Sequence, residues 1–117
     1  MVKLESLKKS NHFKIVLKEK KFHTDFFSIF VAKNFIKSKY KNTLKISFVM
    51  KKKIGNAVKR NRIKRKLKGV IQKMLKEKNS INLNYTYVIF GKEKIYSEHS
   101  NSLFRNMEKS FKKINRE

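Results

Sequence analysis

The segment 51–66 joins a break in the chain to a dense cluster of cations, and it constrains the fold more than any other part of the sequence. Gly55-Asn56 follows a strand-like run and opens a helix. The first turns of that helix carry alternating cations, although the helix dipole favours acidic residues near an N-terminus. Crowding like charges in this way costs folding free energy. A polyanion would neutralise them, so the segment points to nucleic acid as the partner.

The charge of the whole chain agrees with this interpretation. Lys and Arg total 32 against eight Asp and Glu, for a net charge of +24. A field of this sign recruits polyanions. The 39% hydrophobic content is enough for the core of one RNA-binding domain over residues 1–117.

The expected compartment is the cytoplasm. The chain has no cysteine, which excludes disulfides and thiolate metal sites and fits a reducing environment. No apolar run is long enough to cross a bilayer, so we expect no membrane partner.

Arginine is the informative cation in this lysine-rich chain. Only five of the 32 cationic residues are arginine, yet Arg60, Arg62 and Arg65 fall within six positions. The planar guanidinium fork matches phosphates and base edges in a way that an ammonium group does not. We therefore expect these three side chains to make geometric contacts with a nucleic acid.

Hydrophobic periodicity predicts an α+β sandwich in the order helix, strand, strand, helix, strand, helix. The predicted helices cover 7–20, the segment after Gly55-Asn56 and a C-terminal stripe from Leu103 to Ile114; the strands cover 26–32, 44–50 and 85–90, with a loop at 33–43 and a helix end at 79–84. Three or four strands would form a mixed sheet packed with helices. We expect the strands 44–50 and 85–90 to be parallel neighbours.

The acidic residues do not suit a metal-dependent nuclease, which needs two or three convergent carboxylates. Asp25 is the only aspartate, and the seven glutamates are scattered along the chain. The histidines, His12, His23 and His99, are far apart in sequence, so a two-histidine ribonuclease is a minor alternative. We expect no catalytic residue and no metal site in the protein.

The basic helix is the first candidate binding surface. Arg60, Lys64 and Lys68 recur every four residues, while Ile63 and Leu67 anchor the opposite face. On an ordinary solvated face, glutamates at this spacing would relieve the repulsion. Their absence favours a helix laid along a phosphate backbone.

The aromatic residues are the second candidate surface. Phe13, Phe26, Phe27 and Phe30 suit stacking on unpaired bases. The alternative, that they belong to the core, is the commoner role for phenylalanine at helix and strand periodicity. Alternation along the strand separates Phe27 from Phe26 and Phe30, so all of them cannot serve one layer.

The run from Lys52 to Arg65 resembles the signature of the bacterial ribonuclease P protein subunit. Its core, Arg60-Asn61-Arg62, is preceded by Lys-Lys-x-Gly-Asn-Ala and followed by Ile-Lys-Arg. Length, charge and element order also match that family, so the resemblance covers nearly the whole chain.

This resemblance implies a subunit of an RNA-based endoribonuclease. Catalysis belongs to the RNA, which removes the 5′ leader of precursor tRNA with Mg2+ held mainly by RNA, and one protein assists each RNA. The family also has a left-handed crossover around the Arg-Asn-Arg helix, against the general right-handed rule. By match, the contacts to the catalytic RNA are Lys52, Lys53, Asn56, Arg60, Asn61, Arg62, Lys64 and Arg65, to which the helix periodicity adds Lys68; the contacts to the leader are Phe13, Leu17 and Phe30.

A stand-alone basic RNA-binding protein, ribosomal-protein-like or an RNA chaperone, is the main alternative. Such a protein would bind RNA through the same helix without stimulating a catalytic RNA. Reconstitution with precursor tRNA separates the two hypotheses.

Overall fold

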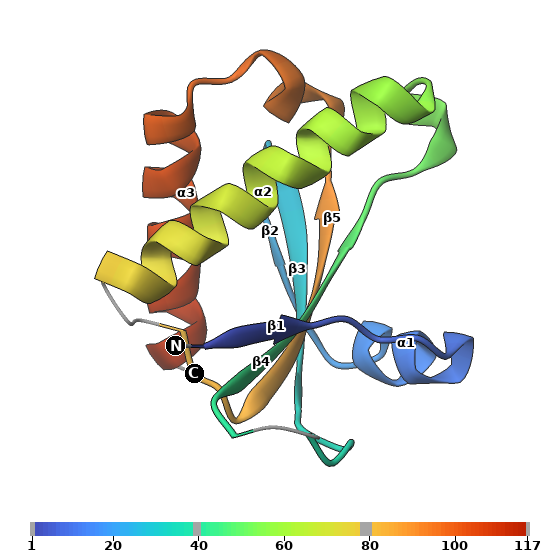
Figure 1. Ribbon diagram of the computed structural model, residues 1–117, viewed down its shortest axis with the longest axis vertical. Helices are drawn as coiled ribbons and strands as arrows, with labels where there is room; N and C mark the ends of the chain where they lie inside the picture. The colour runs from blue at the N-terminus through green and yellow to red at the C-terminus, as the bar shows by residue number, and fades with distance from the viewer. Residues whose placement is uncertain (1, 39–40, 78–80, 117) are drawn as a thin grey trace.

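The computed structural model describes residues 2–38, 41–77 and 81–116 (Figure 1). The elements, in chain order, are β1 (Lys3–Glu5), α1 (Ser10–Leu17), β2 (Lys20–His23), β3 (Phe27–Lys33), β4 (Thr43–Val49), the 3₁₀ helix η1 (Lys52–Ile54), α2 (Ala57–Glu77), β5 (Tyr85–Gly91), the 3₁₀ helix η2 (Glu93–Ser97) and α3 (Ser100–Arg116). The expected α+β class is confirmed. Of the helix end predicted at 79–84, residues 79 and 80 lie outside the described residues.

The strands form one mixed sheet in the order β1-β4-β5-β3-β2. β4 runs parallel to β5, with Ile46 opposite Tyr87, which confirms the expected neighbours. β3 is antiparallel to both β5 and β2. In the described ranges the sheet therefore has five strands, rather than the three or four expected.

The two additional strands explain this difference. β1 is three residues long and β2 is four, and Phe22 is the only residue of β2 that is not fully exposed. Neither segment has the apolar alternation that marks a strand in a sequence. Pairing with β4 and β3 creates these two strands. Because β2 begins at Lys20, the helix predicted over 7–20 covers only Ser10–Leu17.

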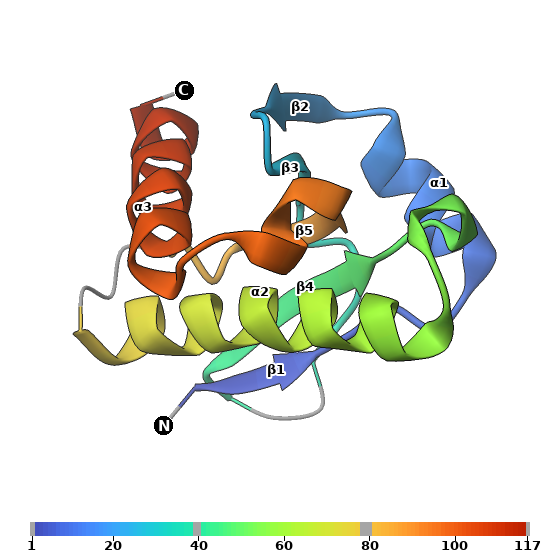
Figure 2. The ribbon, with the colours of Figure 1, turned by 90° about the horizontal axis from the view of Figure 1, so that it is seen from above.

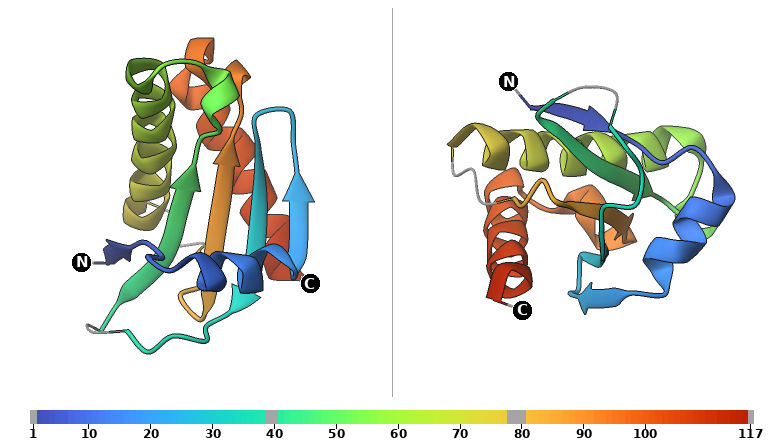
Figure 3. Two further views of the ribbon diagram at one scale, coloured as in Figure 1. Left: turned by 90° about the vertical axis from the view of Figure 1, so that its right-hand side faces the viewer. Right: turned by 90° about the horizontal axis from the view of Figure 1, so that it is seen from below.

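The α2 helix crosses from β4 to β5 with a left hand, as the resemblance implied. In the left view of Figure 3, β4 and β5 point upward with β5 to the right of β4. α1 lies in front of the sheet, and α2 lies behind it. Seen from the helix side, the chain therefore moves leftward, which is the uncommon hand.

Helices cover the two faces of the sheet unequally, as Figure 2 shows with α3 and α1 on opposite sides. The larger core joins α2 and α3 to one face and includes Phe26, Phe27 and Tyr87. These two phenylalanines therefore take the core role. The smaller core joins α1 to the other face through Val16, Ala32 and Val88, and it leaves part of that face open.

The apolar stripe of α2 is buried as the periodicity predicted. Its fully or nearly fully buried residues are Ile63, Leu67, Val70, Ile71 and Met74. The stripe holds the helix against the sheet and turns its other faces outward. No helix in the described ranges is long and apolar enough to cross a membrane.

Candidate nucleic-acid interface

The start of α2 is built by Gly55 and Asn56. Gly55 has a φ of +155°, where a side chain is strained, and an added Cβ would lie 2.9 Å from Lys59 Cδ. Asn56 Oδ1 accepts the backbone N–H of Lys59 at 2.9 Å, as a helix cap does. Asn56 therefore has a structural role in addition to the RNA contact implied by the resemblance.

The exposed face of α2 carries most of the residues expected to contact RNA. Asn61, Arg62, Lys64, Arg65 and Lys68 are all exposed. Ile63 and Leu67 between them are fully buried. Lys52 and Lys53 are exposed on η1, immediately before the helix. The helix therefore presents a set of cations on a rigid element.

Arg60 differs from this set because it is only half exposed. Its Nε is enclosed and has no hydrogen-bond partner among the described residues. Arg62 is therefore exposed to solvent, whereas the Nε of Arg60 is not. Arg60 precedes Ile63 by three residues, which places its stem beside the buried stripe.

Two lysines of the basic segment are engaged within the protein. Lys66 Nζ donates to the carbonyl oxygens of Ile95, Tyr96 and Glu98 at 3.1, 2.8 and 3.0 Å. Lys59 Nζ donates to Glu93 Oε1 at 2.7 Å. Charge alone does not distinguish these lysines from those that remain available to a ligand.

A cleft of about 610 Å³ opens on the sheet face that α1 leaves uncovered. Its apolar wall includes Leu17 of α1, Phe30 of β3 and Phe90 at the end of β5. Lys51 and Lys53 line the side next to α2. The cleft and the basic helix thus meet at η1.

Aromatic rings and cations alternate in this cleft. The rings of Phe30 and Phe90 lie edge to face, with centroids 5.5 Å apart. Lys21 Nζ lies 5.5 Å from the Phe30 centroid, and Lys51 Nζ lies 5.9 Å from the Phe90 centroid. Rings beside cations are the arrangement with which proteins bind single-stranded nucleic acid.

Phe13, the third residue expected at the leader site, does not line the cleft. It is half-buried and packs against the smaller core. Leu17 and Phe30 do line the cleft, and they are joined there by Phe90. Alternation along 85–90 puts Phe90 on the opposite face of the strand from the buried Tyr87 and Ile89. This alternation was the signal in the sequence that could have placed Phe90 on the cleft side of the sheet.

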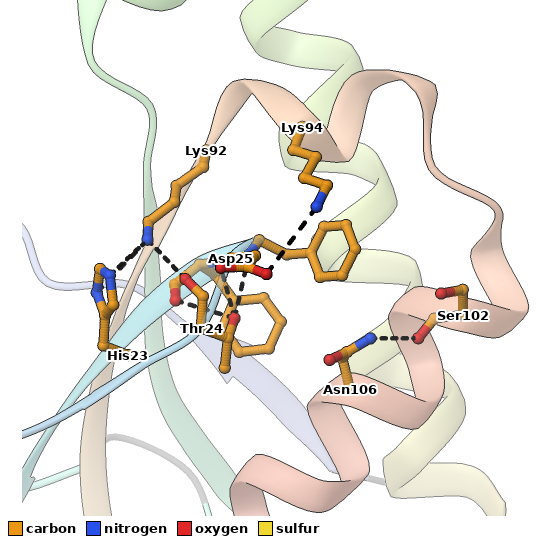
Figure 4. Close-up of polar contacts among 9 residues, drawn as sticks. His23, Thr24, Asp25, Lys92, Lys94, Ser102 and Asn106 are labelled. Atoms are coloured by element: carbon orange, nitrogen blue, oxygen red, sulfur yellow. Dashed lines mark hydrogen bonds and ion pairs between the residues drawn. The ribbon is translucent and has the colours of Figure 1, made fainter.

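His23, Ser28 and Lys92 also line this cleft and form a polar cluster. Figure 4 shows the contacts of Lys92 with His23 and Thr24. Lys92 Nζ lies 2.8 Å from His23 Nε2 and donates to the Thr24 carbonyl at 2.6 Å. An ammonium group only donates, so His23 Nε2 accepts. The ring hydrogen then lies on Nδ1 and is donated to Ser28 Oγ at 2.8 Å.

The other histidines lie on different elements. His12 of α1 packs against the ring of Phe35, and the backbone N–H of His99 donates to Glu98 Oε1 before α3 begins. Among the described residues, no three His, Asp or Glu side chains gather in a way that would hold a metal ion.

Comparisons with known proteins point to one family. The family model "Ribonuclease P" matches residues 1–115. The ribonuclease P protein component of Mycoplasmopsis synoviae (strain 53) is 31% identical over 111 residues, covering 84% of this chain and 92% of that protein.

Two solved structures share the fold. A Staphylococcus aureus RNase P protein mutant with defective mRNA degradation activity has a TM-score of 0.74 at 21% identity, covering 94% of this chain and 87% of that one. The Thermotoga maritima RNase P protein has a TM-score of 0.73 at 20% identity, covering 93% and 96%. From the family match and the curated relative together, the chain belongs to the ribonuclease P protein family.

Proposed function

We propose that this protein binds the ribonuclease P RNA through the N-terminal half of α2 and holds the 5′ leader of precursor tRNA in the cleft. Membership of the family implies a ribonuclease P holoenzyme and an RNA partner. The proposal concerns the two binding surfaces and which RNA each of them binds.

The observation that carries the proposal is the position of the cleft beside the basic helix. Phe30 and Phe90 form an apolar floor, and Lys51 and Lys53 separate that floor from α2. A folded RNA on the exposed face of α2 would therefore lie next to a single strand in the cleft. This arrangement would bring the catalytic RNA close to the leader of its substrate.

The cleft suits a single strand better than a duplex. Rings such as Phe30 and Phe90 stack on base faces, and a duplex hides those faces. Lys21 and Lys51 lie beside the rings, where the phosphates of a stacked strand would pass. Binding of this kind tolerates many sequences, as leaders of different tRNAs require.

The protein acts through charge and position, and the chemistry belongs to RNA and Mg2+. Phosphates of the catalytic RNA and of the substrate would hold the Mg2+ ions that activate water. The cations of α2 and the cleft reduce the repulsion between these two RNAs. The protein should therefore lower the Mg2+ concentration needed for cleavage.

Reconstitution on precursor tRNA at low Mg2+ tests the proposal. Protein alone, ribonuclease P RNA alone and the mixture are compared. We expect cleavage at the mature 5′ end from the mixture, and from RNA alone only at higher Mg2+. Cleavage by RNA-free protein would instead indicate a protein ribonuclease, and binding without stimulation would indicate a stand-alone RNA-binding protein.

A further inference from the structure

The 3₁₀ helix η2 lies against the side of α2 and is anchored there by one lysine. Lys66 Nζ donates to three backbone carbonyls in and after η2, those of Ile95, Tyr96 and Glu98. Ile95 is fully buried. The ammonium group thus uses all three of its donors to fix the η2 backbone to the middle of α2.

Anchoring η2 places the ring of Tyr96 under two cations of α2. Lys59 Nζ lies 5.1 Å from the ring centroid, and Arg62 Cζ lies 5.3 Å from it. Both distances are within the range of a cation–π contact. Tyr96 therefore connects η2 to the Arg60-Asn61-Arg62 core of the basic helix.

The two cations over this ring, Lys59 and Arg62, differ in whether their N–H donors remain available to a ligand. Lys59 is paired with Glu93, and this hydrogen bond together with the charge of Lys59 lowers the pKa of the Glu93 carboxyl. Arg62 makes no hydrogen bond or ion pair with any other described residue, so its donors stay available. A guanidinium that lies over a ring can still present N–H donors at its edge to a phosphate.

We propose that Tyr96 is a positioning residue for Arg62, holding its guanidinium fork in the orientation that docks on the ribonuclease P RNA. This inference rests on the proposed function of α2. Lys66 takes part by fixing η2, which places the ring. Because the fork is held before binding, less side-chain freedom is lost when the contact to RNA forms.

The chain provides a matched control on the same helix. Lys73 Nζ lies 4.9 Å from the centroid of the Phe104 ring, which is a cation–π contact between α2 and α3. Both Tyr96 and Phe104 are half-buried. Lys73 lies in the C-terminal half of α2, outside the residues assigned to the RNA.

A double-mutant cycle on Tyr96 and Arg62 tests the inference. The dissociation constant for ribonuclease P RNA is measured for the full chain and for Y96L, R62A and the double variant, over a range of salt. We expect Y96L to weaken binding about two- to fivefold, the value of an exposed cation–π contact. In the R62A background, Y96L should add no further loss. Y96F, which keeps the ring, and F104L should bind as the parent does.

The salt dependence supplies a second readout that a loss of stability would not produce. R62A should lower the slope of log affinity against log salt by about 0.7–0.9, because one phosphate contact is lost, whereas Y96L should lower the slope less than R62A does, because Arg62 still reaches its phosphate. Thermal unfolding of Y96L and F104L shows whether the two ring removals perturb the fold equally.

Two results would overturn the inference in different ways. An equal loss from Y96L with and without Arg62 would mean that Tyr96 acts independently of Arg62, and the proposed function would stand. No effect of R62A would overturn both this inference and the assignment of Arg62 to the RNA surface.

Discussion

Phe30 of β3 and Phe90 of β5 lie edge to face across adjacent strands, with an interplanar angle of 69°. The register places Phe30 opposite Val88 and Ser28 opposite Phe90, so the two rings meet diagonally on the open face of the sheet. Both rings line the same cleft, and neither is fully buried. A base stacked on one ring would therefore lie beside the other.

Removing either ring should weaken binding of precursors with long leaders. We expect Phe30→Ala and Phe90→Ala each to cost about 1–3 kcal/mol, the value of one base–aromatic stack. The measurement is the affinity of the reconstituted holoenzyme for precursors whose leaders differ in length. Phe35→Ala is the control, because Phe35 is exposed but lies outside this cleft. An equal loss for substrates without a leader would exclude the cleft as the leader site.

Phe13→Ala should lower stability rather than discriminate between leader lengths. Phe13 packs against the smaller core beside Val16 and is half-buried. Losing part of this apolar contact should cost about 1–3 kcal/mol in the free energy of unfolding. Urea denaturation measures this cost. A leader-length effect as large as that of Phe90→Ala, with unchanged stability, would return Phe13 to the binding surface.

Cations assigned to the RNA surface and a cation near the C-terminal end of α2 should differ in the salt dependence of RNA binding. Arg65→Ala and Lys68→Ala should each lower the slope of log affinity against log salt by about 0.7–0.9, the effect of losing one phosphate contact. Lys76→Ala is the control, since Lys76 is exposed near the other end of the same helix. Equal slopes for all three variants would mean that the whole helix contributes only a diffuse field.

Replacing Gly91 or Gly69 with alanine should change the stability of the protein in opposite directions. A Cβ on Gly91 would lie 2.8 Å from Met50 Sδ and 2.9 Å from Leu67 Cδ1, so Gly91→Ala should destabilise the protein by about 1–3 kcal/mol. A Cβ on Gly69 would meet nothing within 4 Å. Because Gly69 is inside α2, Gly69→Ala should stabilise by up to about 1 kcal/mol. Thermal unfolding of both variants checks the pair; a stable Gly91→Ala protein would contradict the close approach.

Tyr87 should make the protein sensitive to alkaline pH. Its hydroxyl donates to the Asn82 carbonyl at 2.9 Å, and burial raises the pKa of Tyr87 above the ordinary value of 10.0. Above that value the unfolded chain releases the proton and the folded chain keeps it, so stability falls as pH rises, by up to about 1.4 kcal/mol per pH unit.

Comparing the parent with Tyr87→Phe between pH 8 and 11 isolates this contribution, because the lysines titrate in both proteins. The variant lacks the hydrogen bond and should be less stable at pH 8. Its disadvantage should shrink as the pH rises past 10. A difference that stays constant with pH would mean that the Tyr87 hydroxyl ionises equally in the folded and unfolded chains.

The sequence by itself determined the elements whose pattern is strong and local. The stripe from Ile63 to Met74 predicted the buried face of α2, and the break at Gly55-Asn56 predicted its start. Both predictions succeed because helix caps and hydrophobic periodicity depend on residues that are close together in the sequence. The Arg60-Asn61-Arg62 run with its flanks was enough to indicate the family before any fold was known. The parallel pairing of β4 with β5 followed from the long helix between them.

Only the tertiary structure decided which of these residues meet. β1 and β2 exist because β4 and β3 offer them partners, and their own residues show no strand pattern. Phe90 joins Phe30 only through the register of β5 against β3. Lys59 and Lys66 resemble their neighbours in sequence, yet η2, some 30 residues away, engages both. Periodicity indicates which side of an element is buried, whereas the residues that this side contacts depend on long-range packing.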